Sequence, residues 1–170
     1  GNVYAAVSSG DIYLQNAGIG DFVALGQTSR AWKMMCAAPN GNIYACTNSA
    51  GVGEVYMQTG GSGAFTSLGI TARDYRGMCA SIDNSVYLTV SGGDIYKQTA
   101  GTGAFAALGE TSRAWRGMAA GIGGNVFAVT ESGPGDIYLQ TAGTGAFTSI
   151  AAAGSWLNIA VVSPGYRFAT

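Results

Sequence analysis

The sequence predicts an all-β fold made of four tandem repeats, and the architecture that fits these repeats best is a β-propeller. Equivalent aromatic residues recur at spacings of 40, 43, 40 and 41 residues, at Tyr4, Tyr44, Tyr87, Phe127 and Phe168. Each repeat contains short runs with alternating apolar and polar residues, bounded by turn residues, which is typical of β-strands. The 28 glycines and the lack of any long helical period indicate a turn-rich chain without membrane-spanning helices.

The repeats cover residues 1–40, 41–83, 84–123 and 124–164 of a single domain, 1–170, and a partial fifth strand follows at 165–170. Each repeat is counted together with the strand that comes just before its range, so in the third repeat the expected strands are 75–81, 85–90, 94–99 and 105–109, which we name strands a, b, c and d. The segment 38–42, "APNGN", supplies proline and glycine for the a–b hairpin of the second repeat. Glycine-rich segments such as 99–105, "TAGTGAF", are expected to connect strand c to strand d.

Strand a is crowded with small residues, including Gly77, Cys79, Gly117 and Ala119. Small side chains suit the innermost strand of a blade, close to a central axis, and both faces of strands b and d are apolar, as sheets packed between neighbours require. A β-trefoil has three such units, and a β-solenoid needs shorter coils. The sequence therefore predicts a four-bladed propeller with sixteen core strands.

The two ends of the chain are expected to meet in one blade. Residues 156–162, "WLNIAVV", would supply the missing strand a of the first blade and close the ring. One strand b is then surplus: either residues 165–170 lie over the outside or compete with 1–7, or one of these segments pairs with another chain, including a second copy. The overlap indicates a junction to further sequence in a longer parent protein or to a neighbouring subunit.

Composition excludes several function classes. Eight basic and nine acidic residues give a net charge of −1, which favours neither nucleic acid nor an anionic membrane as a partner. The chain has no histidine, so a Ser-His-Asp triad and a histidine-ligated metal are excluded. Its three cysteines are expected to be small buried thiols. We expect no catalytic residues, metal or cofactor, and the missing initial methionine and leader suggest a mature product or an excised domain.

One motif stands out because arginine is scarce. An arginine lies two residues before a large aromatic residue three times, at Arg30 and Trp32, Arg73 and Tyr75, and Arg113 and Trp115. The b–c loops carry nearly all of the length variation between repeats, and this d–a connection lies on the same face. Insertions on one face often mark the binding face of a repeat protein. Two interpretations follow. In the first, these six residues bind a ligand. In the second, the arginines form hydrogen bonds or ion pairs with loop carbonyls or nearby acids, and the aromatic residues pack between neighbouring blades.

Two other sets of residues recur in every repeat. The acids before strand c should accept bonds from local backbone N–H groups, and they are Asp11, Glu54, Asp94 and Asp136. The glutamines that end strand c should form a ladder of amide and hydroxyl bonds between sheets, and they are Gln15, Gln58, Gln98 and Gln140.

The order of these motifs resembles a known family. An aromatic residue and an apolar strand, then "APNGNIYAC", "DIYKQT" and a glycine-rich turn, are similar to the repeat of tachylectin-type lectins and of related propellers in bacterial and phage surface proteins. The resemblance implies a multivalent, non-enzymatic carbohydrate-binding propeller with glycans or a glycosylated surface as its partner. It also implies an extracellular or surface-associated location. The alternative function is that of a structural or assembly subunit of an extracellular fibre, virion or surface polymer.

Overall fold

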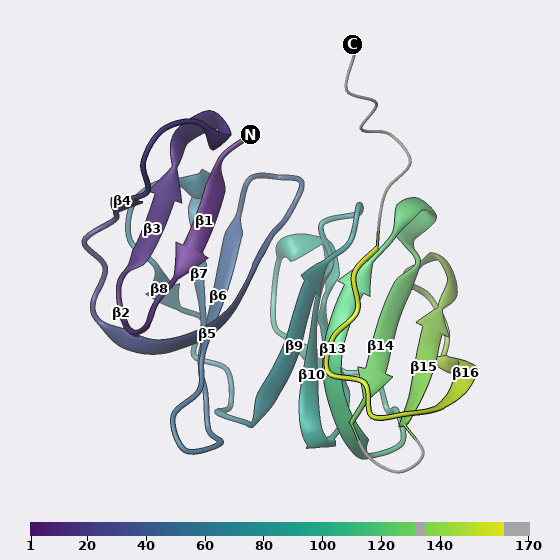
Figure 1. The fold of residues 1–170 in the computed structure, drawn as a ribbon. Helices are drawn as coiled ribbons and strands as arrows, with labels where there is room; N and C mark the ends of the chain where they lie inside the picture. Colours follow the sequence, from purple (N-terminus) through teal and green to yellow (C-terminus); the bar gives the residue numbers. More distant parts are fainter. Residues whose placement is uncertain (132–134, 162–170) are drawn as a thin grey trace. The chain divides into compact units, whose positions relative to one another are not determined.

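The computed structural model describes residues 1–131 and 135–161, and the chain forms two compact units, Gly1–Tyr75 and Arg76–Thr170 (Figure 1). Both units consist of β-strands and short 3-10 turns, and the described residues contain no α-helix. Within this part of the chain there is consequently no helix with the length and apolarity to cross a membrane. The prediction of an all-β fold is confirmed.

The first unit contains two antiparallel sheets. Strands b, c and d of the first repeat are β1 (Val3–Ala6), β3 (Ile12–Gln15) and β4 (Val23–Ala24), in the order β1-β3-β4. The second repeat supplies all four strands, β5 (Arg30–Ala37), β6 (Ile43–Thr47), β7 (Val55–Gln58) and β8 (Thr66–Ser67). A short strand, β2 (Ser8–Gly10), pairs with β5 and completes a five-stranded sheet.

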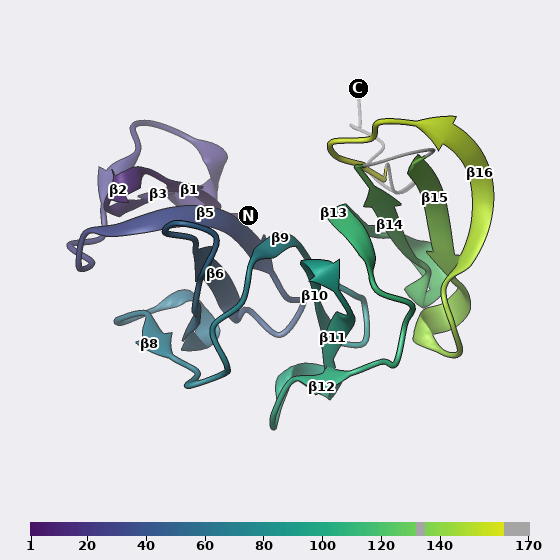
Figure 2. The same cartoon turned by 90° about the horizontal axis from the view of Figure 1, so that it is seen from below.

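The second unit contains one sheet of eight strands. The third repeat supplies β9 (Tyr75–Ala80), which begins at the last residue of the first unit, with β10 (Val86–Gly93), β11 (Ile95–Gln98) and β12 (Ala106–Ala107) (Figure 2). The fourth repeat supplies β13 (Arg113–Ala120), β14 (Val126–Thr130), β15 (Gly135–Gln140) and β16 (Thr148–Gly154). The strands expected in the third repeat are therefore all present.

The sheets, of three, five and eight strands with none of them closed, do not confirm the expected four separate blades. The reason lies at the end of strand b. In β10, Ser91 and Gly93 pair with Ala114 and Arg113 of the next repeat, which joins two repeats into one sheet. β2 makes the equivalent contact with β5 in the first unit.

A closing strand was expected at 156–162. The described part of this segment, 156–161, has no strand structure. Residue 162 and the expected fifth strand at 165–170 lie outside the described residues.

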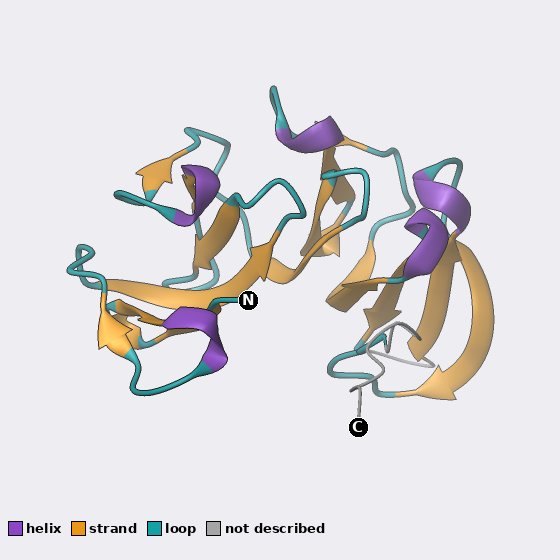
Figure 3. Cartoon of the chain, turned by 90° about the horizontal axis from the view of Figure 1, so that it is seen from above, coloured by secondary structure: helices purple, strands orange, loops and turns teal. Residues whose placement is uncertain are grey.

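Each c–d connection begins with a 3-10 turn, and these turns are Asn16–Gly18, Thr59–Gly61, Thr99–Gly101 and Thr141–Gly143 (Figure 3). The glutamine before each turn donates its side-chain N–H to the carbonyl five residues later, at 2.6 to 2.8 Å. The predicted glutamine ladder between sheets is thus wrong, because the amide donor of each glutamine closes its own turn.

The two units repeat the same packing. The core of the first contains Ile12, Trp32, Ile43, Ala45, Tyr56 and Phe65, and the core of the second contains the equivalent Ile95, Trp115, Val126, Ala128, Tyr138 and Phe147. Equivalent residues are 82 or 83 positions apart. A side-chain acceptor also binds the backbone N–H of the core phenylalanine in both units, Gln27 in one and Glu110 in the other, at 2.9 Å. The chain is thus a duplication of a two-repeat module.

Candidate functional site

The aromatic members of the arginine motif are buried. Trp32, Tyr75 and Trp115 are 3%, 2% and 1% exposed, and the two tryptophans pack edge-on against Tyr56 and Tyr138. Tyr75 donates its hydroxyl to the carbonyl of Thr71 at 2.7 Å. These rings fill the cores of the repeats, so any ligand contact made by the motif has to come from the arginines.

The arginines lie beside the b–c loops, as the sequence predicts. Strand or bridge pairing joins each arginine of the motif to a loop glycine, in the pairs Gly10–Arg30, Gly53–Arg73 and Gly93–Arg113. Arg30 and Arg73 are half-buried, and Arg113 is exposed. The d–a connections therefore lie at the loops whose lengths vary between repeats.

The first unit forms a cluster of three side chains around Arg30. Its Cζ lies 4.6 Å from the centre of the Tyr56 ring, within the range of a cation–π contact. The Tyr56 hydroxyl donates a hydrogen bond of 2.6 Å to Oε2 of Glu54. Burial, reinforced by the carboxylate of Glu54, raises the pKa of Tyr56, so the phenol keeps its proton at neutral pH.

The second unit reproduces this cluster. The Cζ of Arg113 lies 4.9 Å from the centre of the Tyr138 ring, and the Tyr138 hydroxyl donates to Oδ2 of Asp136 at 3.0 Å. Burial again raises the pKa of Tyr138. We call these two sets, Arg30–Tyr56–Glu54 and Arg113–Tyr138–Asp136, the arginine–tyrosine clusters.

Among the described residues, the guanidinium groups of Arg30 and Arg113 have no hydrogen bond or ion pair. A guanidinium stacked on a ring keeps its N–H donors in the plane of the group, where they match the two oxygens of a carboxylate. The two clusters can therefore receive an acidic group from solution.

The acids of the other two repeats have different hydrogen-bond partners. Asp11 accepts the backbone N–H groups of Ile12, Gly26 and Gln27 at 2.7 to 2.8 Å, and Asp94 makes the same three bonds in the third repeat. The prediction of local backbone bonds is thus confirmed for these two acids, whereas Glu54 and Asp136 bind tyrosine hydroxyls.

The sequence alone did not identify Tyr56 and Tyr138 as the partners of the arginines. A tyrosine follows an acid by two residues in all four repeats, so the local pattern does not distinguish the two repeats that form clusters. An arginine stands at the start of strand a in the second, third and fourth repeats, at Arg30, Arg73 and Arg113, so the arginine motif narrows the choice without singling out these two tyrosines.

The described residues contain no group of three side chains suited to hold a metal ion. Burial raises the pKa of Cys46 and Cys79 to about 12, so these thiols are protonated at neutral pH and are poor nucleophiles.

A separate pocket of about 240 Å³ opens in the first unit, between β1 and β5. Its lining is mainly apolar and consists of Asn2, Val3, Tyr4, Met35, Cys36, Ala37 and Ile43. It contains none of the arginine–tyrosine residues, so it is a distinct feature of the surface.

No family model and no curated protein matches the sequence. Solved structures do match. TolB from Acinetobacter baumannii is 17% identical with a TM-score of 0.62 over 84% of this chain and 38% of its own. A streptogramin B lyase is 17% identical with a TM-score of 0.59, over 87% and 53%. YCF48 bound to D1 peptide is 15% identical with a TM-score of 0.62, over 87% and 49%.

These neighbours are β-propeller proteins, so the chain has a propeller fold. It spans between about a quarter and three-fifths of the length of the structures that it matches. The finer resemblance to tachylectin-type lectins is not confirmed.

Two predictions about function are contradicted. The neighbours are mostly enzymes, such as the streptogramin B lyase and a gluconolactonase from Xanthomonas campestris, or protein-binding propellers, rather than carbohydrate lectins. This overturns the predicted lectin or structural role, and the presence of enzymes among them contradicts the prediction that the chain is not an enzyme. The error arose because short turn and strand motifs report the blade architecture, which propellers of many functions share.

Proposed function

We propose that the chain is a protein-binding propeller module whose two arginine–tyrosine clusters bind carboxylates of an acidic segment in a partner protein. The observation that carries the proposal is the repeated guanidinium without a hydrogen bond or ion pair among the described residues, stacked on a tyrosine in both units. A side chain that stabilised only its own repeat would be expected to use its donors there. The N–H donors of Arg30 and Arg113 instead make no hydrogen bond or ion pair among the described residues.

The geometry favours a carboxylate. The stacked ring restricts the guanidinium to one plane, which lowers the entropy lost when two parallel N–H···O bonds form. The acid of each cluster is already occupied by the tyrosine hydroxyl, at Glu54 and at Asp136. Two neighbours support a protein partner in general terms, since one is YCF48 bound to a peptide and another comes from a nidogen–laminin complex.

Fluorescence anisotropy tests the proposal with a labelled peptide of alternating glutamate and glycine, and with the matching glutamine and glycine peptide as the neutral probe. We expect the acidic peptide to bind and the neutral one to bind much more weakly. Each lost charge-assisted contact, worth about 1.5–3 kcal/mol, should weaken binding by roughly tenfold or more. Affinity should fall as salt concentration rises.

The matched control is Arg116→Gln, which removes one positive charge at a guanidinium that is already ion-paired with Glu131 at 2.6 Å. This variant should keep most of the peptide affinity, whereas Arg30→Gln with Arg113→Gln should lose it. Equal losses in the control and the double variant, or equal affinity for the two peptides, would refute a specific carboxylate site.

A further inference from the structure

The third repeat shows how a strand a pairs with the strand b that follows it. Strand β9 is the strand a of the third repeat, and it pairs with β10, the strand b of that repeat. Cys79 of β9 packs in one cluster with Tyr87 and Met118. As a result Val86 and Tyr87 of β10 are completely buried.

The first module has the same strand b without a strand a. β1 corresponds to the first half of β10, with Tyr4 aligned to Tyr87, but it pairs only with β3 among the described residues. Val3 is 42% exposed, whereas its equivalent Val86 is buried. The pocket of about 240 Å³ lined by Val3, Tyr4 and Met35 lies where the equivalent Tyr87 and Met118 pack against Cys79 in the second unit.

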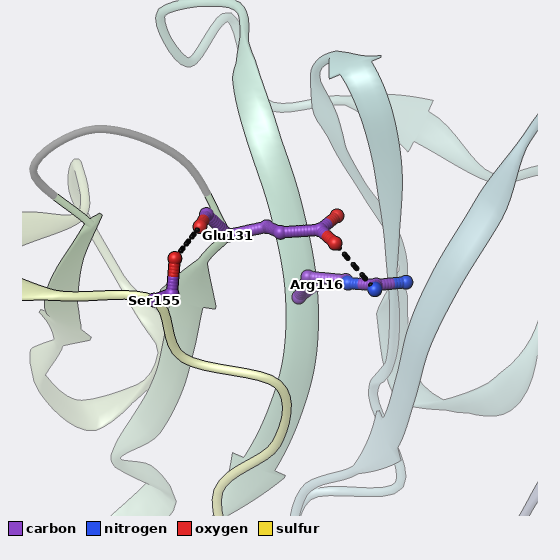
Figure 4. Close-up of polar contacts among 3 residues, drawn as sticks. All are labelled: Arg116, Glu131 and Ser155. Carbon is purple, nitrogen blue, oxygen red and sulfur yellow. Dashed lines mark hydrogen bonds and ion pairs between the residues drawn. The ribbon is translucent and has the colours of Figure 1, made fainter.

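The second module ends with a segment in the sequence position of strand a, and this segment has no strand b to pair with among the described residues. Residues 155–161 follow β16. Trp156 occupies the repeat position that Trp32, Tyr75 and Trp115 hold in the first part of strand a. Ser155 donates to the backbone carbonyl of Glu131 at 2.8 Å, which holds the start of the segment in the second unit (Figure 4).

The segment also lies against β13. A Cβ added to Gly117 would be 2.7 Å from the Cα of Asn158, so the glycine permits this close approach. Residues 155–161 are thus held in the second unit without any strand partner among the described residues.

We propose that residues 156–161 of one copy of the chain pair with β1 of a second copy and occupy the pocket beside it. The contact would reproduce, between two chains, the pairing of strand a with strand b that β9 and β10 show in the third repeat. An unpaired strand edge is a template for such addition. A second copy fits because the propellers that this chain matches continue well beyond the matched part, so another pair of modules supplies comparable length.

The repeats also specify the register. Cys36 pairs with Tyr44 in the second repeat, and Ala119 pairs with Phe127 in the fourth. By equivalence, both pairs place Ala160 of one copy opposite Tyr4 of the other copy. The next pair along is Ile159 with Ala5, as deduced from Met35 with Ala45 and Met118 with Ala128. A small residue, Ala160, would therefore take the place of Cys79 over the pocket.

Disulfide cross-linking tests this register. One chain carries Ala5→Cys and a second, tagged chain carries Ile159→Cys, both with Cys36→Ala, and the two are mixed and oxidised. Directly opposite strand residues lie within disulfide reach. We expect a cross-linked product with twice the mass of one chain. Replacing Ala5→Cys by Ala6→Cys shifts the register by one residue and turns the thiol to the other face, so this pair should not cross-link.

Two matched substitutions then test the association by sedimentation of the full chain. Ala160→Arg puts a long charged side chain at the small position over the pocket and should leave only monomers. Leu157→Arg is the control, since Lys33 and Arg116 stand at the equivalent position in other strands a, and it should associate as the unchanged protein does. Circular dichroism confirms that both variants fold.

A monomer at all protein concentrations, without the cross-link, would overturn the proposal. A disulfide that forms only within a chain carrying both cysteines would also overturn it, because residues 156–161 would then pair with β1 of their own chain. Association that Ala160→Arg leaves intact would contradict the proposed contact as well.

Discussion

The guanidinium of Arg30 stacks on the ring of Tyr56 at 4.6 Å, and Arg113 stacks on Tyr138 at 4.9 Å in the equivalent place of the second unit. Both contacts join the start of strand a to strand c of the same repeat. The tyrosine is in turn bound by an acid two residues before it. The duplicated module has therefore kept a charged surface group along with its core.

The tyrosine has two separable roles in this cluster. Tyr56→Phe should keep the ring beneath Arg30 and lose only the bond to Glu54, at a cost of about 1 kcal/mol in the free energy of unfolding. Tyr56→Leu also removes the ring face, so it should weaken peptide binding more than Tyr56→Phe does. Urea denaturation and anisotropy measure the two effects. Equal peptide affinity in the two variants would show that the stacking plays no part in binding.

The buried tryptophans should behave as core residues. Trp32→Ala and Trp115→Ala should each cost about 3–5 kcal/mol in the free energy of unfolding, because they empty a packed aromatic cluster. Trp32→Phe should lose less and should retain the peptide affinity of the folded protein. If folded Trp32→Phe fails to bind peptide while Arg30→Gln still binds, the ligand contacts the tryptophan instead.

Asp11 and Asp94 should matter more for stability than Glu54 does. Each aspartate accepts three backbone N–H groups, two from the d–a connection and one from the residue that follows it. Asp94→Ala leaves those donors without a partner, so we expect a loss of roughly 2–3 kcal/mol, while exposed Glu54→Ala should cost about 1 kcal/mol or less. Chemical denaturation of the two variants gives the comparison, and a larger loss for Glu54→Ala would contradict it.

In three of the four c–d turns an alanine lies in a conformation that favours glycine. Ala17, Ala100 and Ala142 have φ of 52°, 51° and 52°, where the second repeat has Gly60. Left-handed backbone costs a residue with a Cβ about 1 kcal/mol or more. Ala100→Gly should therefore raise the melting temperature slightly, whereas Ala107→Gly, in strand β12, should lower it. A decrease for Ala100→Gly would contradict the assigned turn.

The thiols should respond to pH according to their burial. Burial raises the pKa of Cys46 and Cys79 from 9.0 to about 12, so the folded state binds these protons more tightly than the unfolded chain. The resulting stability is present below about pH 9 and is lost as pH rises towards 12. Denaturation between pH 8 and about pH 11 should show this decline. A matched Cys79→Ala variant should decline less steeply, and an equal slope would exclude the thiol as the cause.

The sequence predicted the strands and turns because their causes are local. The recurrence of Tyr44 and its equivalents fixed the repeat length, and Gly41, with φ of 87°, closes the a–b hairpin that proline and glycine predicted. The extension of β10 to Gly93 was not predictable. Its length depends on pairing with Arg113 of the next repeat, and that is a tertiary contact.

The position of the arginines was predictable from the sequence, whereas their aromatic partners were not. Meander topology places Arg30 beside a b–c loop, and its pairing with Gly10 confirms that placement. The ring nearest the guanidinium belongs to Tyr56, since Trp32 turns into the core. Alternation along strand a does not reveal which aromatic residue faces the arginine, because strand c is distant in sequence.

Isothermal titration with a short glutamate and glycine peptide tests the central claim most directly, since the duplicated clusters predict two equivalent sites per chain. We expect a stoichiometry of two for the unchanged protein, one for Arg30→Gln or Arg113→Gln alone, and no binding when both are replaced. A stoichiometry that stays the same when Arg30 and Arg113 are both replaced would contradict the assignment of the clusters as the binding sites.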